Sequence, residues 1–235
     1  MYKAILALDT SHELISLALG SGKETWYLEI DAGQRHSELL MEAVDSLCKL
    51  SNFDKSTLDL VCCMEGPGSF TGLRISYASA KGIALSLGIP LAAVPSLDCM
   101  AAHLSSFPGI VAAVMDAKQN RFFCSLNKNG RQEGEILDAD YSTILHKLES
   151  AGSFQQENII LTGPGAKLLY MQFMEKNSTI KNIILDPQYK QGRARELLEL
   201  VKNDTINKIK DPGSGPLYIR KSDAEINRES GREKR

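Results

Sequence analysis

The stretch Glu65-Gly66-Pro67-Gly68-Ser69-Phe70-Thr71-Gly72-Leu73-Arg74 determines how the rest of the chain is interpreted. It follows a short apolar run, residues 58–64, that is typical of a buried strand, and it precedes a helix rich in Ala, Gly and Ser. Gly66 and Gly68 let another chain or a ligand approach the backbone, and Ser69 can cap the helix. The stretch therefore predicts a strand-to-helix turn that presents backbone N–H groups at the positive end of a helix.

Three known kinds of loop can be compared with this turn residue by residue. A phosphate-binding P-loop needs a lysine directly after its last glycine, and Leu73 stands there instead. A dinucleotide-binding fingerprint needs its third glycine one position earlier than Gly72. A hydrolase nucleophile elbow needs glycine two positions before and after the serine, where Ser69 has Pro67 and Thr71. The turn therefore matches none of the three templates.

Composition and charge set the bounds for the whole chain. Its 235 residues are enough for one large domain or two small ones, and 43% hydrophobic residues can build a real core. Lys and Arg number 27 against 29 Asp and Glu, so the net charge of −2 gives no overall basic field for nucleic acid. The first apolar run is too short for a signal peptide, and no stretch approaches the length of a membrane span. We expect a cytoplasmic protein with no membrane contact.

Cysteine and histidine spacing gives no pattern of metal ligands. The 5 cysteines are odd in number, show no C-x-x-C spacing and lie mostly in apolar segments, so reduced, buried thiols are expected. His36 opens a predicted helix, where a surface or capping role is the expectation, and no second histidine stands four residues away. We predict no metal site.

The first predicted strand ends in a polar turn. Residues 3–8, 13–19 and 24–30 predict three strands, and Asp9-Thr10-Ser11 follows the first of them. A carboxylate followed by two hydroxyls at the carboxyl end of a first strand can meet a phosphate or a metal-bound phosphate. The same residues are also typical of a plain Asx or Ser/Thr turn. Both interpretations stay open from these residues alone.

Two helices are predicted in the first half, at His36–Leu50 and Thr71–Leu87. The first is amphipathic, with apolar residues at helical spacing. The second carries a row of small residues at every fourth position, which lets another helix or strand pack unusually close. That row consists of Gly72, Ser76, Ala80, Ala84 and Gly88. Internal packing and contact with a partner chain are the two uses of such a row.

The second half repeats the plan of the first in weaker form. Residues 110–116 predict a strand that again ends in an aspartate, Asp116, and a second strand follows at residues 121–126. A second glycine turn, Gly163-Pro164-Gly165, follows the strand predicted at residues 158–162.

Two halves that each begin with antiparallel strands and continue in βαβα order predict an α/β fold of two related lobes with mixed sheets. We place the first lobe at residues 1–106 and the second at residues 107–221. Residues 222–235 form a charged tail that we expect to be disordered.

These motifs, in this order, resemble the bacterial TsaB (YeaZ) family, which is needed for the threonylcarbamoyl modification of adenosine 37 in tRNAs that read codons beginning with A. The match covers nearly the whole chain. The residues that carry it are Leu6–Ser11, His36–Ser37, Gly66–Arg74, Met115–Lys118, Arg121–Phe123, Gly163–Ala166 and Pro216–Arg220. The resemblance implies the actin/hexokinase/heat-shock-70-like (RNase H-like) fold of two related lobes, which agrees with the repeated plan.

The resemblance implies a subunit and not an enzyme. TsaB is similar to TsaD, the subunit that performs the threonylcarbamoyl transfer, and TsaD's metal site uses paired histidines on a helix. In this chain His12, His36, His103 and His146 lie far apart in sequence, so we predict no catalytic residue. The implied role is a non-catalytic subunit that binds and supports TsaD in a complex with the ATPase TsaE, and that meets tRNA through this complex.

Two other activities compete with this role. The first is a small ATPase or kinase of the same fold, with phosphate at Asp9 and Thr10. The second is a protease-like activity attached to relatives, which lacks support because no Ser/His/Asp set or metal pair can be assembled from the motifs.

The resemblance also implies where contacts lie. The first two helices of the amino-terminal lobe form the contact with TsaD, or with a second copy of the chain when TsaD is absent. The predicted interface residues are His36, Leu39, Leu40, Ala43, Leu47, Gly72, Ser76, Ala80 and Ala84, and ordinary core packing is the alternative for each.

A second set of residues stands near the positions where nucleotide-binding relatives hold phosphate and adenosine, or belongs to the glycine turn. The predicted ligand contacts are Asp9, Thr10, Ser11, Gly66, Gly68, Ser69, Asp116, Gly163 and Gly165. We expect no cofactor that belongs to the chain alone, with ATP or ADP held at the interface of the complex.

Overall fold

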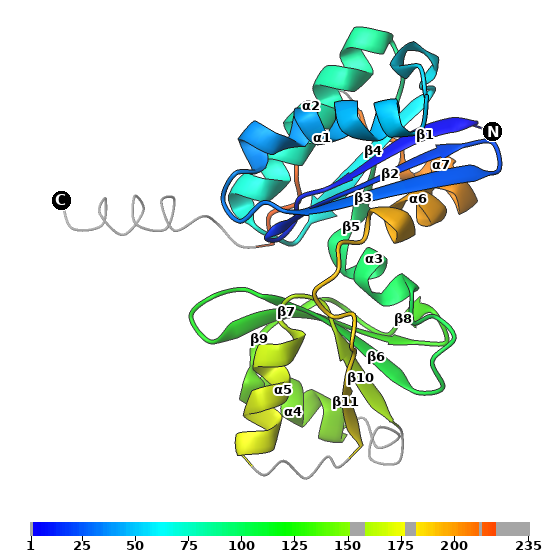
Figure 1. The fold of residues 1–235 in the computed structure, drawn as a ribbon. Helices are drawn as coiled ribbons and strands as arrows, with labels where there is room; N and C mark the ends of the chain where they lie inside the picture. Colours follow the sequence, from blue (N-terminus) through cyan, green and yellow to red (C-terminus); the bar gives the residue numbers. More distant parts are fainter. Residues whose placement is uncertain (1, 151–157, 177–181, 212, 220–235) are drawn as a thin grey trace.

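The computed structural model describes residues 2–150, 158–176, 182–211 and 213–219, and these form two α/β lobes, each built on one sheet (Figure 1). Both sheets begin with antiparallel strands and continue with parallel ones. The mixed sheets and the repeated plan predicted from the sequence are therefore confirmed. The tail predicted at residues 222–235 lies outside the described residues.

The first sheet has the strand order β3-β2-β1-β4-β5. Its strands are β1 (Ala4–Asp9), β2 (Leu14–Ser21), β3 (Glu24–Asp31), β4 (Leu60–Gly66) and β5 (Leu91–Pro95). Every residue of β1 is buried, because helices cover both faces of the sheet at its centre. At the edge, β3 alternates between exposed and half-buried residues.

Helices α1 (His36–Leu50) and α2 (Phe70–Leu87) cover one face of the first sheet (Figure 1). A short 3-10 turn, η1 (Lys55–Thr57), lies between α1 and β4. The Ser69 hydroxyl caps the start of α2 by accepting from the Gly72 N–H, and Gly88 ends the helix in the left-handed conformation.

The opposite face of the first sheet is covered by α6 (Ala194–Asn203), followed by α7 (Thr205–Lys208). The apolar side of α6 packs Leu197, Leu198 and Val201 against β1, β4 and β5, where they are fully buried. This differs from the expected second lobe at residues 107–221, because an amphipathic helix binds the sheet that best covers its apolar face and not the one nearest in sequence. The chain therefore returns to the first lobe after residue 185.

The second sheet has the order β11-β10-β6-β7-β8, and β9 pairs with β7. Its strands are β6 (Ile110–Asp116), β7 (Arg121–Lys128), β8 (Arg131–Gln132), β9 (Leu137–Asp140), β10 (Ile159–Thr162) and β11 (Ile183–Leu185). Helices α4 (Tyr141–Ser150) and α5 (Ala166–Glu175) cover its outer face. Helix α3 (Ser96–Ala102) lies between the two sheets and packs against β4, β5, β6 and β7 (Figure 1).

All 5 cysteines are free and buried, as the sequence predicts. Burial raises the pKa of the Cys124 thiol to about 12. The thiols therefore serve as small apolar core groups.

Candidate functional site

The turn after β1 is one of the predicted ligand contacts, and its polar groups bind other parts of the same chain. Asp9, Thr10 and Ser11 are all buried. One carboxylate oxygen of Asp9 accepts from the backbone N–H and the hydroxyl of Ser11, at 2.9 and 2.7 Å, and the other accepts from the Arg193 N–H at 2.9 Å. The Thr10 hydroxyl donates to the Gly72 carbonyl at 2.7 Å. The turn thereby joins the ends of β1, α2 and α6.

The glycines of the strand-to-helix turn are required by close packing within the chain. A Cβ at Gly66, where φ is +119°, would lie 2.6 Å from the Leu217 carbonyl oxygen, and one at Gly68 would lie 2.9 Å from the Ser11 carbonyl oxygen. A Cβ at Gly72 would overlap the Thr10 carbonyl oxygen. The turn predicted from residues 65–74 is thus present, and its glycines admit neighbouring backbone.

The second glycine turn packs in the same way on the end of β6. A Cβ at Gly163 would lie 2.5 Å from the Val114 carbonyl oxygen, and one at Gly165 would lie 2.7 Å from the Asp116 nitrogen. The Asp116 carboxylate accepts from the Lys118 N–H at 2.7 Å and pairs with the Lys118 ammonium at 2.8 Å. Asp116 is partly exposed, in contrast to the buried Asp9.

A buried charged cluster, which we call the junction cluster, lies where the chain passes between the lobes. It consists of the side chains of His103, Thr162, Asp186 and Arg193 together with the backbone of Gln188. The Arg193 side chain is 2% exposed, and its Nη2 donates to the Gln188 carbonyl at 2.7 Å and lies 3.4 Å from Asp186 Oδ2. That same oxygen accepts from the Thr162 hydroxyl at 2.7 Å and lies 2.9 Å from His103 Nε2.

In the junction cluster, hydrogen bonding and charge shift the pKa of Asp186 in the direction opposite to burial. Burial alone would raise the pKa of Asp186, but hydrogen bonds from Thr162, the Gln188 N–H and His103 outweigh it, so the pKa of this carboxyl is lowered. Burial lowers the pKa of the Arg193 guanidinium. Among the described residues, Arg193 Nε is a buried donor with no acceptor.

No pattern in the sequence predicts the junction cluster. Arg193 opens an amphipathic helix just as an exposed arginine would, and Arg195, two residues later, is exposed. The partners of Arg193 lie up to 184 positions away, at Asp9, and 90 positions away, at His103. A local pattern therefore contains no signal that separates the two arginines.

The structure corrects the predicted interface on α1 and α2. His36, Leu40, Ala43, Leu47, Gly72, Ser76, Ala80 and Ala84 are buried, and only Leu39 is half-buried. These side chains lie in the core of the first lobe, where the small residues let α2 lie close to the turn after β1. His36 is neither exposed nor a helix cap as expected: it is buried, and its Nε2 lies 2.8 Å from the His12 carbonyl oxygen in the turn that follows β1.

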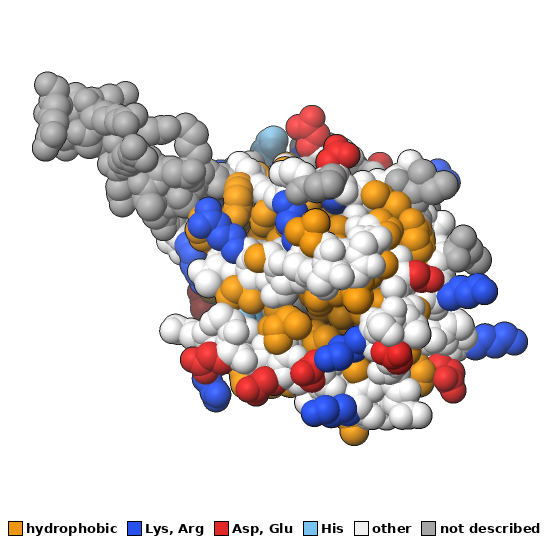
Figure 2. Space-filling view, turned by 90° about the horizontal axis from the view of Figure 1, so that it is seen from above, with side chains coloured by type: hydrophobic (Ala, Val, Ile, Leu, Met, Phe, Trp, Pro, Cys, Tyr) orange, Lys and Arg blue, Asp and Glu red, His pale blue; other side chains and the backbone are white. Residues whose placement is uncertain are grey.

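The outer face of the same two helices is partly apolar. Met41 on α1 and Leu85 on α2 are 46% and 75% exposed. On α2, Ala78 and Gly82 are exposed on the same side as Leu85, and a Cβ at Gly82 would have no neighbour within 4 Å. Figure 2, which looks down on this end of the molecule, shows hydrophobic side chains gathered in the middle of the view with charged ones around them.

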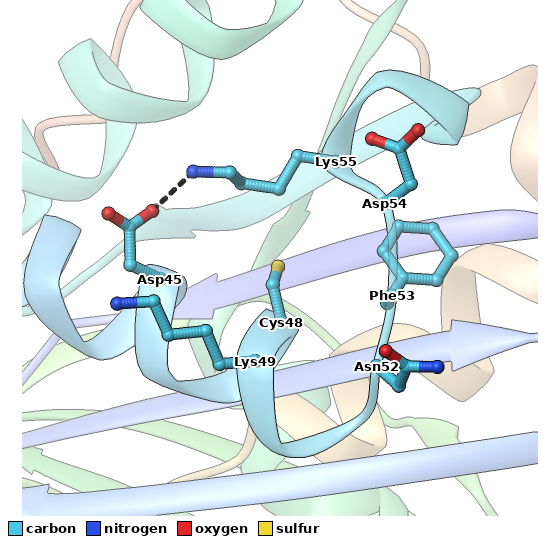
Figure 3. A pocket seen from close by; sticks show the side chains of 7 residues that line it. All are labelled: Asp45, Cys48, Lys49, Asn52, Phe53, Asp54 and Lys55. Carbon is cyan, nitrogen blue, oxygen red and sulfur yellow. Dashed lines mark hydrogen bonds and ion pairs between the residues drawn. The ribbon is translucent and has the colours of Figure 1, made fainter.

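An open hollow of about 430 Å³ lies between the last turn of α1 and η1 (Figure 3). The Lys55 ammonium and the Asp45 carboxylate pair at 2.6 Å at its rim. Burial raises the pKa of the Cys48 thiol that lines it, so this sulfur is a poor nucleophile. The hollow is separate from every residue predicted as a ligand contact.

Within residues 2–150, 158–176, 182–211 and 213–219, no three His, Cys, Asp or Glu residues are grouped so that they could hold a metal ion. In those same ranges no helix has the length and apolar character to cross a membrane.

The chain is similar over most of its length to proteins of one biosynthetic system. The family model described as "TsaD: tRNA N6-adenosine threonylcarbamoyltransferase" matches residues 30–228. The tRNA threonylcarbamoyladenosine biosynthesis protein TsaB of Bacillus subtilis is 30% identical over 230 residues, which are 94% of this chain and 96% of that protein. The TsaB protein of Haemophilus influenzae is 28% identical over 92% of this chain and 93% of that protein.

Solved structures show the same fold. YeaZ from Pseudomonas aeruginosa superimposes with a TM-score of 0.74 at 23% sequence identity, covering 92% of this chain and 100% of that one. Component A of (R)-2-hydroxyglutaryl-CoA dehydratase from Acidaminococcus fermentans superimposes with a TM-score of 0.50 at 10% identity, covering 86% and 98% of the two chains. The predicted α/β fold of two related lobes is confirmed.

Proposed function

Because the chain belongs to the TsaB (YeaZ) family of tRNA threonylcarbamoyladenosine biosynthesis proteins, we propose that it acts in this pathway as a non-catalytic subunit that binds and supports TsaD. The pathway modifies adenosine 37 of tRNAs that read codons beginning with A. In this proposal TsaE joins the complex, tRNA is met through the complex, and ATP or ADP binds at its interface. A second copy of the chain takes TsaD's place when TsaD is absent.

The proposal rests on the outer face of α1 and α2, where we place the contact with TsaD. A helix of TsaD would lie along α2 over Ala78 and Gly82, whose small size lets two helix axes come close. Leu85 and Met41 would lose their remaining exposure in this contact, and burial of apolar area is the main favourable term in association. The residues buried beneath α2 support this contact from inside and do not touch the partner.

Two substitutions on the outer face test the contact. Leu85→Glu places a charge in it, and Gly82→Trp blocks the approach of a partner helix, while neither side chain enters the lobe's core. We expect each variant to weaken binding to purified TsaD at least about tenfold in a titration, since a central contact is worth about 1.4 kcal/mol or more.

The matched control is Leu168→Glu on α5 in the second lobe, because Leu168 is 43% exposed and lies away from α1 and α2. This variant should bind TsaD as the wild type does. Wild-type binding by both α2 variants, with unchanged circular dichroism, would show that this face is not the contact.

The competing ATPase or kinase activity predicts that the chain alone hydrolyses ATP. It needs Asp9 to contact a phosphate or a metal-bound phosphate, yet both oxygens of Asp9 accept hydrogen bonds from Ser11 and Arg193. We expect the purified chain alone to release no phosphate from ATP above the background of Asp9→Ala. Hydrolysis by the wild type that Asp9→Ala abolishes would favour the enzyme over the subunit.

A further inference from the structure

One residue is hydrogen-bonded to both lobes. The chain crosses between the lobes at residues 96–109 and returns at residues 186–193. At the end of the return, the Arg193 backbone N–H donates to Asp9 in the first lobe. Its side chain reaches the other way, to the Gln188 carbonyl and to Asp186, which follows β11 of the second sheet. The position of Arg193 therefore depends on how the two lobes meet.

The turn after β1, which Arg193 contacts, is also hydrogen-bonded to the start of α2. The Ser11 carbonyl accepts from the Ser69 N–H at 2.8 Å, just before the first residue of α2. The Thr10 hydroxyl donates to the Gly72 carbonyl at 2.7 Å, in the first turn of the helix. At Gly68 and Gly72 no side chain separates the two segments, so they are in backbone contact.

These bonds cannot relax independently. Asp9, Thr10, Ser11 and Arg193 are at most 2% exposed, so a donor or acceptor that loses its partner is not rescued by bulk water. A shift of Arg193 must therefore move the turn after β1, and this movement must reach the first turn of α2. The buried Nε of Arg193 has no acceptor among the described residues, so the guanidinium is not fully satisfied in this arrangement of the lobes.

We propose that Asp9, Thr10 and Ser11 form a relay that positions the first turn of α2 according to how the lobes meet at Arg193. The residues first predicted to contact a ligand are thus positioning residues for the helix whose outer face binds TsaD. Only this last step, from α2 to TsaD, rests on the proposed function.

Amide hydrogen exchange in the isolated chain tests the relay without any partner. Arg193→Met removes the bonds to the second lobe but keeps the backbone N–H that binds Asp9. We expect it to speed exchange of the Ser69 and Leu73 amides at least about tenfold, measured relative to the Val61 amide of β4. Arg193→Lys, which keeps the charge but loses the planar fork, serves as the second variant if the first does not fold.

Two matched controls separate the relay from general loosening. Arg195→Met removes an exposed guanidinium from the same helix and should leave the exchange ratio within about twofold of the wild type. Thr10→Val should raise the ratio because it removes the hydroxyl, while Thr10→Ser, which keeps it, should not. A ratio unchanged in Arg193→Met and Thr10→Val would overturn the relay.

A double variant measures the coupling itself. If Arg193 acts on α2 through Thr10, then Thr10→Val should change the exchange ratio less in the Arg193→Met background than in the wild type. If the fold-change in the exchange ratio of the double variant equals the product of the two single-variant fold-changes, the two substitutions act independently. This result would also overturn the relay.

A final measurement connects the relay to TsaD. Arg193→Met should weaken TsaD binding although Arg193 is buried at the lobe junction. If the wild-type chain does not bind TsaD at all, the proposed function fails, and the exchange ratios still decide the relay independently.

Discussion

Gly72 and Gly82 lie on the same helix, and their surroundings are opposite. A side chain at Gly72 would overlap the backbone of Thr10, whereas one at Gly82 would enter open space. The sequence alone shows two glycines in an Ala-rich helix and does not separate them. The difference comes from the turn after β1, where Thr10 lies 62 positions from Gly72 along the chain.

Alanine at these two positions should therefore change stability in opposite directions. Gly72→Ala forces two backbone segments apart and should lower the free energy of unfolding by about 3 kcal/mol or more. Gly82→Ala should raise it by about 0.5–1 kcal/mol, because alanine favours a helix over glycine. Urea unfolding of the two variants beside the wild type measures both. A loss of stability in Gly82→Ala equal to that in Gly72→Ala would contradict the packing described here.

Residues whose partners lie far away in the sequence are not predicted from local sequence patterns. The sequence marks Asp9 and Thr10 by their place at the carboxyl end of a strand. The structure confirms that place and gives their polar groups partners within the chain. No local pattern marks Arg193, Asp186 and His103, because Asp186 and Arg193 lie on one chain crossing and His103 lies on the other. They come together only when two chain crossings meet.

At the scale of elements, periodicity predicted most helices and strands but not which surface each would cover. Small residues line both sides of α2, with Ser76 and Ala80 inside and Ala78 and Gly82 outside. Helical spacing cannot tell which row faces the sheet, and the row predicted to contact a partner is the inner one. The same limit explains α6, which lies in the range predicted for the second lobe, residues 107–221, but covers the first sheet.

The packing of α6 gives a prediction for this element. Leu198 is fully buried against the first sheet, so Leu198→Ala should cost about 3 kcal/mol of unfolding free energy through the cavity that it leaves. Leu85→Ala, at a leucine that is 75% exposed, should change it by less than about 0.5 kcal/mol.

Amide exchange locates the effect of Leu198→Ala. The loss of protection should appear first in β1 and β4 of the first sheet, which α6 covers. Loss of amide protection confined to β6 and β10 would instead show that α6 covers the second sheet.

At the scale of the whole molecule, the junction cluster makes lobe packing depend on pH. The pKa of Asp186 is lowered in the folded chain, so its carboxylate stabilises the fold above its unfolded pKa of about 3.9. This contribution is lost as the pH falls through the lower, folded pKa. Asp186→Asn should cost about 3 kcal/mol at pH 7, because it breaks a buried ionic contact with Arg193.

Urea unfolding of the wild type and Asp186→Asn between pH 7 and pH 2.5 follows this dependence. The stability difference between the two proteins should persist down to about pH 4 and shrink below it. A difference that stays constant to the lowest pH would mean that the Asp186 charge does not contribute.

We expect this two-lobed chain of the TsaB family to support TsaD through the outer face of α2. Reconstitution of threonylcarbamoyladenosine at position 37 of a tRNA transcript, with TsaD, TsaE and threonylcarbamoyl-adenylate, measures this role directly. We predict product only when this chain is added. When the concentration of this chain limits the reaction, Leu85→Glu should give at least about tenfold less product than the wild type. Full modification without the chain, or with Leu85→Glu at the wild-type rate, would contradict it.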